Sequence, residues 1–208
     1  MVAKYISPIR LYEHPLSGNA YKAKLLLHQL SVEYEGVTVD IFAGEHKKEE
    51  FSALNPNCKI PVLSDGDFVM WESNAILFYL ANKFSPNPYL SDDPETYGLI
   101  AQWTFFGKTT IDPNLALARY FAKFLPPDQV PPGVMEKLHA QGNVALAILE
   151  DHLSRTEFLS GDYSIADIAC YPYTMLCEEG GFDLEPYPSV RRWCGSVEGT
   201  PDFIAFAG

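Results

Sequence analysis

A proline-rich stretch of ten residues divides this chain into two parts with different patterns. Residues 85–94 read SPNPYLSDDP, with three prolines and almost no apolar periodicity, which is typical of a linker. Before it, residues 1–84 alternate between the two-residue period of strands and the 3.6-residue period of helices. After it, we find no convincing strand alternation. The sequence therefore predicts an α/β domain over 1–84, a linker over 85–94 and an all-helical domain over 95–208.

The first part predicts seven elements in the order β-α-β-α-β-β-α. Strands are expected over 9–12, 37–41, 60–63 and 68–71, and helices from Asn19, within 44–54 and from Glu72-Ser73 to Leu80. An Asp-Gly pair at 65–66 between two apolar runs predicts a hairpin joining the last two strands. Ser73 is expected to be the N-cap of the last helix, because its hydroxyl can accept from the first free amides.

The second part predicts long helices over Tyr97–Phe124 and Val134–Leu153. Between them stands PPDQVPPG, whose four prolines force a break because proline has no amide proton to donate. Ser164-Ile165-Ala166-Asp167 resembles a capping box, with Asp in place of the usual Glu, and predicts a further helix start before an apolar run.

Charge excludes two classes of partner. The chain has 208 residues and a formal net charge of −12, whereas nucleic acid and anionic membranes both reward clustered Lys and Arg. The charge is uneven: residues 1–84 hold 10 acidic and 8 basic residues, and residues 85–208 hold 17 and 7. No apolar stretch approaches the ~18 residues of a membrane span.

The cysteines predict neither a metal site nor a dithiol centre. None of the four forms a C-x-x-C pair, which would signal a zinc or redox motif. We therefore expect reduced thiols, no metal and a cytoplasmic location. Cys170 and Cys177 are expected within one apolar helix and in the core.

Four sequence blocks in one order carry a resemblance to a known family. The blocks are PLSGNAYK at 15–22, NPNCKIPVL at 55–63, ESNAI at 72–76 and YSIADIA at 163–169. Together they resemble the cytosolic glutathione transferase family, and look most like bacterial members with Ser/Thr and Asn after the first strand, including those similar to the nu class. The resemblance implies a thioredoxin-like domain followed by a helical domain, glutathione as co-substrate and a homodimer.

The first candidate site residues match the γ-glutamyl end of glutathione, which carries a carboxylate and an ammonium on one carbon. Glu72 can take the ammonium, and the Ser73 hydroxyl with the amides of a helix start can take the carboxylate. The family uses its acidic-Ser pair in this way. For an isolated pair, a helix cap beside a solvated carboxylate is the competing interpretation.

A second group of candidates would hold the rest of the tripeptide. The resemblance implies a cis Ile60-Pro61 bond, which would let the Ile60 backbone pair with the cysteinyl backbone as an added strand does. Lys59 is a candidate partner of the glycyl carboxylate. His46 stands where similar bacterial members often carry a glutamine that contacts glutathione. An exposed lysine and a solvated histidine are the alternatives.

The thiolate must be stabilised by hydrogen-bond donors near a helix start. A free thiol has a pKa of about 8.5, and each unit of lowering requires roughly 1.4 kcal/mol. Ser17 and Asn19 lie where the first strand meets the first helix and match the family's Ser/Thr-x-Asn arrangement; both are also ordinary turn and cap residues. Tyr12 is a third candidate, with a packing role as its alternative. Cys58 lies close to Pro61, but no neighbouring cysteine would resolve a mixed disulfide.

The expected function is transfer of glutathione to a small apolar electrophile. The second substrate would bind between the domains, with Trp103, Phe106, Tyr120 and Tyr171 as candidate wall residues, although aromatics at helical spacing are more often core. A glutathione-dependent disulfide reductase and a non-catalytic binding protein on the same fold remain alternatives, because a fold does not fix a function. The acidic second part is expected to disfavour anionic second substrates.

Overall fold

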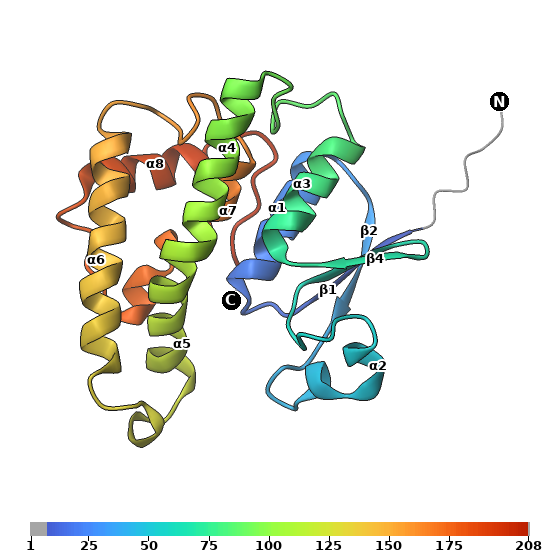
Figure 1. The fold of residues 1–208 in the computed structure, drawn as a ribbon, viewed down its shortest axis with the longest axis horizontal. Helices are drawn as coiled ribbons and strands as arrows, with labels where there is room; N and C mark the ends of the chain where they lie inside the picture. The colour runs from blue at the N-terminus through green and yellow to red at the C-terminus, as the bar shows by residue number, and fades with distance from the viewer. Residues whose placement is uncertain (1–7, 208) are drawn as a thin grey trace. The chain divides into compact units, whose positions relative to one another are not determined.

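The chain folds into two units, which a computed structural model describes over residues 8–207. The first unit runs up to Asn87 and also takes in the chain from Ile204 onward, and the second spans Pro88–Phe203. The first is an α/β unit and the second is helical, as the sequence predicts (Figure 1). The boundary falls inside the predicted linker, but the last residues group with the first unit rather than with the helices before them.

A four-stranded mixed sheet forms the centre of the first unit. Its strands are β1 (Ile9–Glu13), β2 (Tyr34–Thr38), β3 (Val62–Asp65) and β4 (Phe68–Trp71), in the order β2-β1-β3-β4. Strand β1 is parallel to β2 and antiparallel to β3, and β3 and β4 form the predicted hairpin. Gly66 has φ of 63°, a conformation that favours glycine, and lies in the two-residue turn between Asp65 and Phe68.

Helical segments cover both faces of this sheet. Helices α1 (Gly18–Gln29) and α3 (Ser73–Lys83) pack side by side (Figure 1). The other face carries η1 (Glu45–Lys47) and α2 (Glu49–Ser52), where Phe51 joins Val39 and Val62 in one buried cluster. Because successive residues of a strand point to opposite faces, Leu11 of β1 faces away from this cluster while Tyr12 packs against it.

Two local predictions in the first unit are wrong. Strand β2 is Tyr34–Thr38, so Val39 and Ile41 of the predicted alternation lie beyond its end, although the Val39 amide still donates to the Glu13 carbonyl at 2.8 Å. The N-cap of α3 is Glu72, and Ser73 is the first helical residue. The predicted cap failed because the Ser73 hydroxyl is engaged elsewhere, in a hydrogen bond to Asn19.

The second unit is a set of helices joined by turns and longer loops. They are α4 (Pro94–Phe106), the π-helical segment η2 (Gly107–Ala116), α5 (Leu117–Phe124), η3 (Pro127–Gln129), α6 (Val134–Leu153), α7 (Ile165–Met175), η4 (Cys177–Gly180) and α8 (Pro188–Glu198). The predicted helix over 97–124 therefore contains a π-helical stretch. Pro113 lies within it and has no amide proton, so the α-helical hydrogen-bond ladder cannot pass through it unchanged. Within residues 8–207 no helix has the length and apolar character that a membrane crossing requires.

Helix α7 is the centre of the second unit, and its residues from Ile165 to Thr174 are all buried. Ser164 caps it and Asp167 completes the predicted capping box. Asp167 is fully buried, and its carboxylate accepts from the Leu159 amide at 3.0 Å, the Ser164 amide at 3.0 Å and the Trp193 indole at 2.9 Å. Burial raises the pKa of Asp167 to about 6, against the effect of these donors.

Candidate functional site

Ser17 is the N-cap of α1 and lies at the turn that leaves β1. Its backbone is extended, with φ of −89° and ψ of 108°, and its Oγ accepts from the Ala20 amide at 3.2 Å. The Ser17 amide donates to the His14 carbonyl at 2.9 Å, which closes the turn. A hydroxyl oxygen that accepts a capping bond still has its proton to donate. Ser17 is half-buried, so the cap and a donor role toward a ligand are compatible.

Asn19, in the first turn of α1, is tied to the start of α3. The Ser73 hydroxyl donates to Asn19 Oδ1 at 3.1 Å, across 54 positions of sequence. Ser73 is 2% exposed, whereas Asn19 is half-buried. The N-termini of α1 and α3 therefore meet at this hydrogen bond, and both helix dipoles favour negative charge beside it.

The segment before β3 is held by a buried asparagine. Asn55 is 1% exposed, donates from Nδ2 to the Lys59 carbonyl at 2.6 Å, and accepts from the Asn57 amide at 2.9 Å. The Ile60-Pro61 peptide bond is cis, as the resemblance implies. Cys58 has φ of 51°, and its thiol lies 3.8 Å from the Pro56 carbonyl. Asn55 was not among the predicted site residues; a polar residue directly before a turn-forming Pro-Asn pair was the available signal.

Glu72 adopts an unusual backbone conformation immediately before α3. Its φ is 75°, in the region that favours glycine. A non-glycine residue held there costs on the order of 1–3 kcal/mol, and such residues cluster at functional sites. The conformation places Glu72 as the N-cap of α3, one residue before the buried Ser73. Glu72 and Ser73 thus adjoin the same pair of helix ends as Asn19.

His46 and Lys59 lie on the two loops that precede and follow α2. His46 is half-buried in η1, and its Nδ1 has no hydrogen-bond partner within the part of the chain that the structure describes. The Lys59 side chain is exposed. No hydrogen bond recorded among residues 8–207 joins either side chain to the group formed by Ser17, Asn19 and Ser73. The structure thus joins Asn19 and Ser73 by a hydrogen bond, with Ser17 at the start of the same helix as Asn19, and leaves His46 and Lys59 on the loops around α2.

Ser17 also lines a cavity of about 260 Å³. One wall is a face of α1 that includes Tyr21 and Lys24, and another is the chain segment from Ile204 to Ala207. The Tyr21 hydroxyl donates to the Ile204 carbonyl at 2.6 Å, and the Tyr21 and Phe206 rings meet edge to face at 5.4 Å. The end of the chain is thereby fixed on α1, one turn after Ser17.

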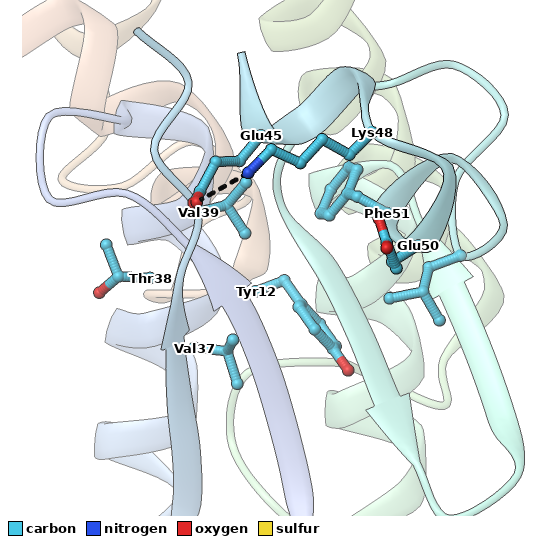
Figure 2. A pocket seen from close by; sticks show the side chains of 9 residues that line it. Tyr12, Val37, Thr38, Val39, Glu45, Lys48, Glu50 and Phe51 are labelled. Carbon is cyan, nitrogen blue, oxygen red and sulfur yellow. Dashed lines mark hydrogen bonds and ion pairs between the residues drawn. The ribbon is translucent and has the colours of Figure 1, made fainter. Parts of the chain in front are cut away.

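A second cavity, of about 370 Å³, lies between the β1–β2 edge and α2. Figure 2 shows Tyr12 and Phe51 among its lining side chains and the ion pair between Lys48 and Glu45, whose atoms are 3.4 Å apart. None of the predicted glutathione-contacting residues lines it. Tyr12 contacts Phe51 edge to face at 6.3 Å, so the packing interpretation of Tyr12 is the one that its contacts favour.

Aromatic residues proposed for the second-substrate wall separate into two groups. Trp103 and Tyr171 are 5% and 1% exposed, and the Tyr171 hydroxyl donates to Glu198 at 2.9 Å, so both belong to the core of the helical unit. Tyr120 is 44% exposed and Phe106 is half-buried. Only these last two retain surface for a ligand.

Three of the four cysteines lie in the interior of the helical unit. Cys170, Cys177 and Cys194 are buried and are not joined in disulfides, and burial raises the pKa of the Cys177 thiol to about 12. Cys177 lies in η4, after the end of α7 rather than inside it. Among residues 8–207 there is no group of three or more His, Cys, Asp or Glu side chains that could hold a metal ion.

Comparison with known proteins identifies the first unit by family. The family described as glutathione S-transferase, N-terminal domain, matches residues 7–82. The curated protein "Disulfide-bond oxidoreductase YfcG" of Escherichia coli (strain K12) is 30% identical, over 93% of this chain and 91% of its own length. The similarity therefore extends across both units.

Solved structures agree over nearly the whole chain. A glutathione S-transferase from Pseudomonas fluorescens superimposes with a TM-score of 0.91 and 41% identity, covering 97% of this chain and 100% of that protein. A glutathione transferase from Burkholderia graminis, with two glutathione molecules bound per protein subunit, superimposes with a TM-score of 0.84 and 28% identity, covering 94% and 85%.

Proposed function

The chain belongs to the glutathione S-transferase family, and from that premise we propose that Ser17 and Asn19 stabilise the thiolate of bound glutathione. The enzyme is a glutathione transferase. We propose which residues stabilise the thiolate and which type within the family the enzyme represents. It is the Ser/Asn type, in which one donor is the N-cap of α1 and the other lies in its first turn. The observation that carries this proposal is the hydrogen bond from Ser73 to Asn19, which places the Asn19 amide at the meeting point of two helix N-termini.

Thiolate stabilisation needs donors that keep a proton to give. Ser17 accepts a capping bond through its oxygen and retains its own proton, and Asn19 uses its oxygen toward Ser73 and retains its amide hydrogens. A hydrogen bond to a charged group contributes about 1.5–3 kcal/mol, which corresponds to roughly one to two pKa units. Two such donors, with the dipole of α1, suffice to bring a thiol from about 8.5 to below neutral pH.

The rest of the tripeptide would be held around these donors. We assign the γ-glutamyl ammonium to Glu72, which is the N-cap of α3 and has a positive φ. The γ-glutamyl carboxylate goes to the amides of that helix start at Ser73. The cysteinyl backbone pairs with Ile60 beside Pro61, and the glycyl carboxylate lies toward Lys59 and His46. Buried Asn55 supports this assignment because it fixes the Lys59 carbonyl and so the approach to Ile60.

The reaction itself is then simple nucleophilic chemistry. The glutathione thiol gives its proton to solvent, and the thiolate attacks an electrophilic carbon to form a carbon–sulfur bond while the leaving group departs. A small apolar electrophile is the expected second substrate. The second-substrate pocket is assigned to the helical domain, with Phe106 and Tyr120 as its accessible aromatic residues.

A second function, disulfide reduction, is favoured by the similarity to YfcG and by the two glutathione molecules in the Burkholderia graminis structure. One glutathione thiolate would attack a substrate disulfide, releasing a thiolate and forming a mixed disulfide. A second glutathione thiolate would attack the mixed disulfide, releasing the other thiol and forming oxidised glutathione. The substrate is reduced by two electrons and two glutathiones are oxidised, so no protein cysteine is required.

One preparation assayed with two substrates separates these functions. The purified protein is given glutathione and either a model aryl halide or a small dialkyl disulfide, and product formation is compared. Turnover of the aryl halide supports transfer, and turnover of the disulfide supports reduction. Binding of glutathione without turnover of either would contradict both functions and favour a non-catalytic protein.

We also propose that the protein is a homodimer. Strand β4 leaves Phe68, Val69 and Trp71 between 36% and 49% exposed, an apolar edge that a second copy would cover. Light scattering after size-exclusion chromatography would give a mass near twice 23.3 kDa, and a mass of one chain would contradict the proposal.

A further inference from the structure

The cavity of about 370 Å³ beneath α2 has walls from two parts of the first unit (Figure 2). Tyr12 and Val37 line it from the sheet, and Phe51 and Leu54 line it from α2 and the turn that follows. Small-molecule sites in proteins have volumes of about 300–1,000 Å³. The cavity is therefore large enough for one small organic molecule.

The side chains that line this cavity favour a flat apolar ligand. Phe51 is 6% exposed, and the Tyr12 ring meets it edge to face at 6.3 Å, so the two rings form an aromatic corner. Val37 and Leu54 are half-buried and add aliphatic surface. A ligand that covered the remaining apolar surface would remove it from water, which is favourable, and an aromatic ring packs well on such walls.

Three charged residues line the same cavity, and their charges do not cancel. The Lys48 ammonium lies 3.4 Å from the Glu45 carboxylate, which also accepts from the Asp40 amide at 2.8 Å. Glu50 is exposed, and no hydrogen bond or ion pair recorded among residues 8–207 involves its carboxylate. One negative charge is thus left over beside an apolar cavity, and this charge favours a cationic ligand.

From these observations we infer that the cavity beneath α2 is a binding site for a small aromatic ammonium compound. The aromatic body packs between Tyr12, Val37 and Phe51, and the ammonium lies beside the Glu50 carboxylate. None of the residues assigned to glutathione lines the cavity, so this site stands apart from the proposed function.

Three naphthalene probes of similar shape and different charge test the inference. They are 1-naphthylmethylammonium, 1-naphthylmethanol and 1-naphthoate. Binding is measured by isothermal titration calorimetry on the full chain saturated with S-hexylglutathione, which blocks the proposed glutathione site and the electrophile pocket. We expect the ammonium probe to bind with a dissociation constant of about 0.1–1 mM, the neutral probe about two- to fivefold more weakly, and the anion more weakly again.

Three variants locate the bound probe. Val37→Phe fills the cavity from an edge strand, where phenylalanine is well tolerated, and should weaken binding of the ammonium probe by about tenfold or more. Glu50→Gln should weaken the ammonium probe by about two- to fivefold and leave the neutral probe unchanged. Glu49→Gln is the matched control, because it removes an acidic charge from the same helix at a residue that does not line the cavity, and it should change neither probe.

The outcomes separate this site from other places where the probe could bind. The absence of saturable binding, the anion as the tightest probe, or equal effects of Glu49→Gln and Glu50→Gln would overturn the inference. Binding that S-hexylglutathione abolishes would place the probe in the electrophile pocket and overturn it too. If S-hexylglutathione itself did not bind, the proposed function would fail, while the effect of Val37→Phe on probe binding would still decide whether the cavity is a site.

Discussion

The indole of Trp193 donates a hydrogen bond to Asp167 Oδ1 at 2.9 Å, and both side chains are fully buried. The same carboxylate oxygen accepts from the Leu159 amide, and the other accepts from the amide and hydroxyl of Ser164. One acidic residue therefore joins the start of α7, the loop before it and helix α8. A single side chain therefore satisfies buried donors from three segments of the helical unit.

Replacing Asp167 should destabilise the helical unit strongly. Asp167→Ala leaves the buried donors of Leu159, Ser164 and Trp193 without an acceptor, and we expect a loss of about 3–5 kcal/mol in the free energy of unfolding. Asp167→Asn keeps one oxygen for Leu159 and Trp193 and should lose less. Denaturant unfolding followed by circular dichroism measures both. Equal stabilities of the two variants would contradict this division of roles between the two oxygens.

The titration of Asp167 predicts a pH dependence with a definite sign. Its pKa is raised from 3.8 to about 6 in the folded state, so between these values the folded chain holds a proton that the unfolded chain releases. The contribution of Asp167 to the free energy of unfolding should therefore fall by about 3 kcal/mol as the pH rises from the lower to the higher of these pKa values. Below the lower value this contribution should not change with pH.

The comparison with Asp167→Asn isolates this effect, because the other carboxyl groups titrate in both proteins. The stability of the wild type relative to the variant should decrease from about pH 4 to pH 6. If the stability of the wild type relative to Asp167→Asn increased over the same range, the hydrogen-bond donors would outweigh burial and hold the pKa of Asp167 below its ordinary value.

The end of the chain should contribute to the stability of the first unit. Phe206→Ala removes the edge-to-face contact with Tyr21, and Tyr21→Phe keeps the ring but removes the hydroxyl that donates to the Ile204 carbonyl. Each should lower the free energy of unfolding by about 1 kcal/mol or slightly more. Thermal and denaturant unfolding of the two variants measure this, and wild-type stability in both would show that the end segment is not fixed on α1.

The charge distribution predicts which second substrates are poor. Residues 85–208 hold 17 acidic and 7 basic residues, a balance of −10, while residues 1–84 are close to neutral at −2. An anionic electrophile should show a lower kcat/KM than a neutral analogue of the same reactivity, by several-fold up to roughly tenfold. Added salt should narrow the difference through screening. A ratio of the two kcat/KM values that does not change with salt, or a higher kcat/KM for the anionic electrophile, would contradict the electrostatic explanation.

Most of the fold could be predicted from periodicity and from proline. Helix α6 has the predicted bounds Val134–Leu153 because a proline-rich break precedes it and its apolar residues follow the helical period. Strand β2 was misplaced because it is an edge strand whose residues are half-exposed or exposed, so pairing with β1, rather than burial, sets its extent. Helix α8 was not predicted, although Pro188 at its first position was a signal.

The candidate site could be predicted as a set of residues but not as an arrangement. Ser17 and Asn19 were found from the turn where β1 meets α1, and Glu72 and Ser73 from the start of α3. No local pattern shows that Ser73 donates to Asn19, 54 positions away, because only the packing of α1 on α3 brings them together. The positive φ of Glu72 is likewise a property of the folded chain, since glutamate does not favour that region.

The thiol pKa of bound glutathione tests the central claim most directly. The pH dependence of thiolate absorbance is measured for the wild type, Ser17→Ala, Asn19→Ala and, as a matched hydroxyl control, Tyr12→Phe. We predict a wild-type value about two units below that of a free thiol, a rise of about one unit in each of the first two variants, and no change for Tyr12→Phe. A wild-type value equal to that of free glutathione, or one unaffected by both Ser17→Ala and Asn19→Ala, would contradict the account.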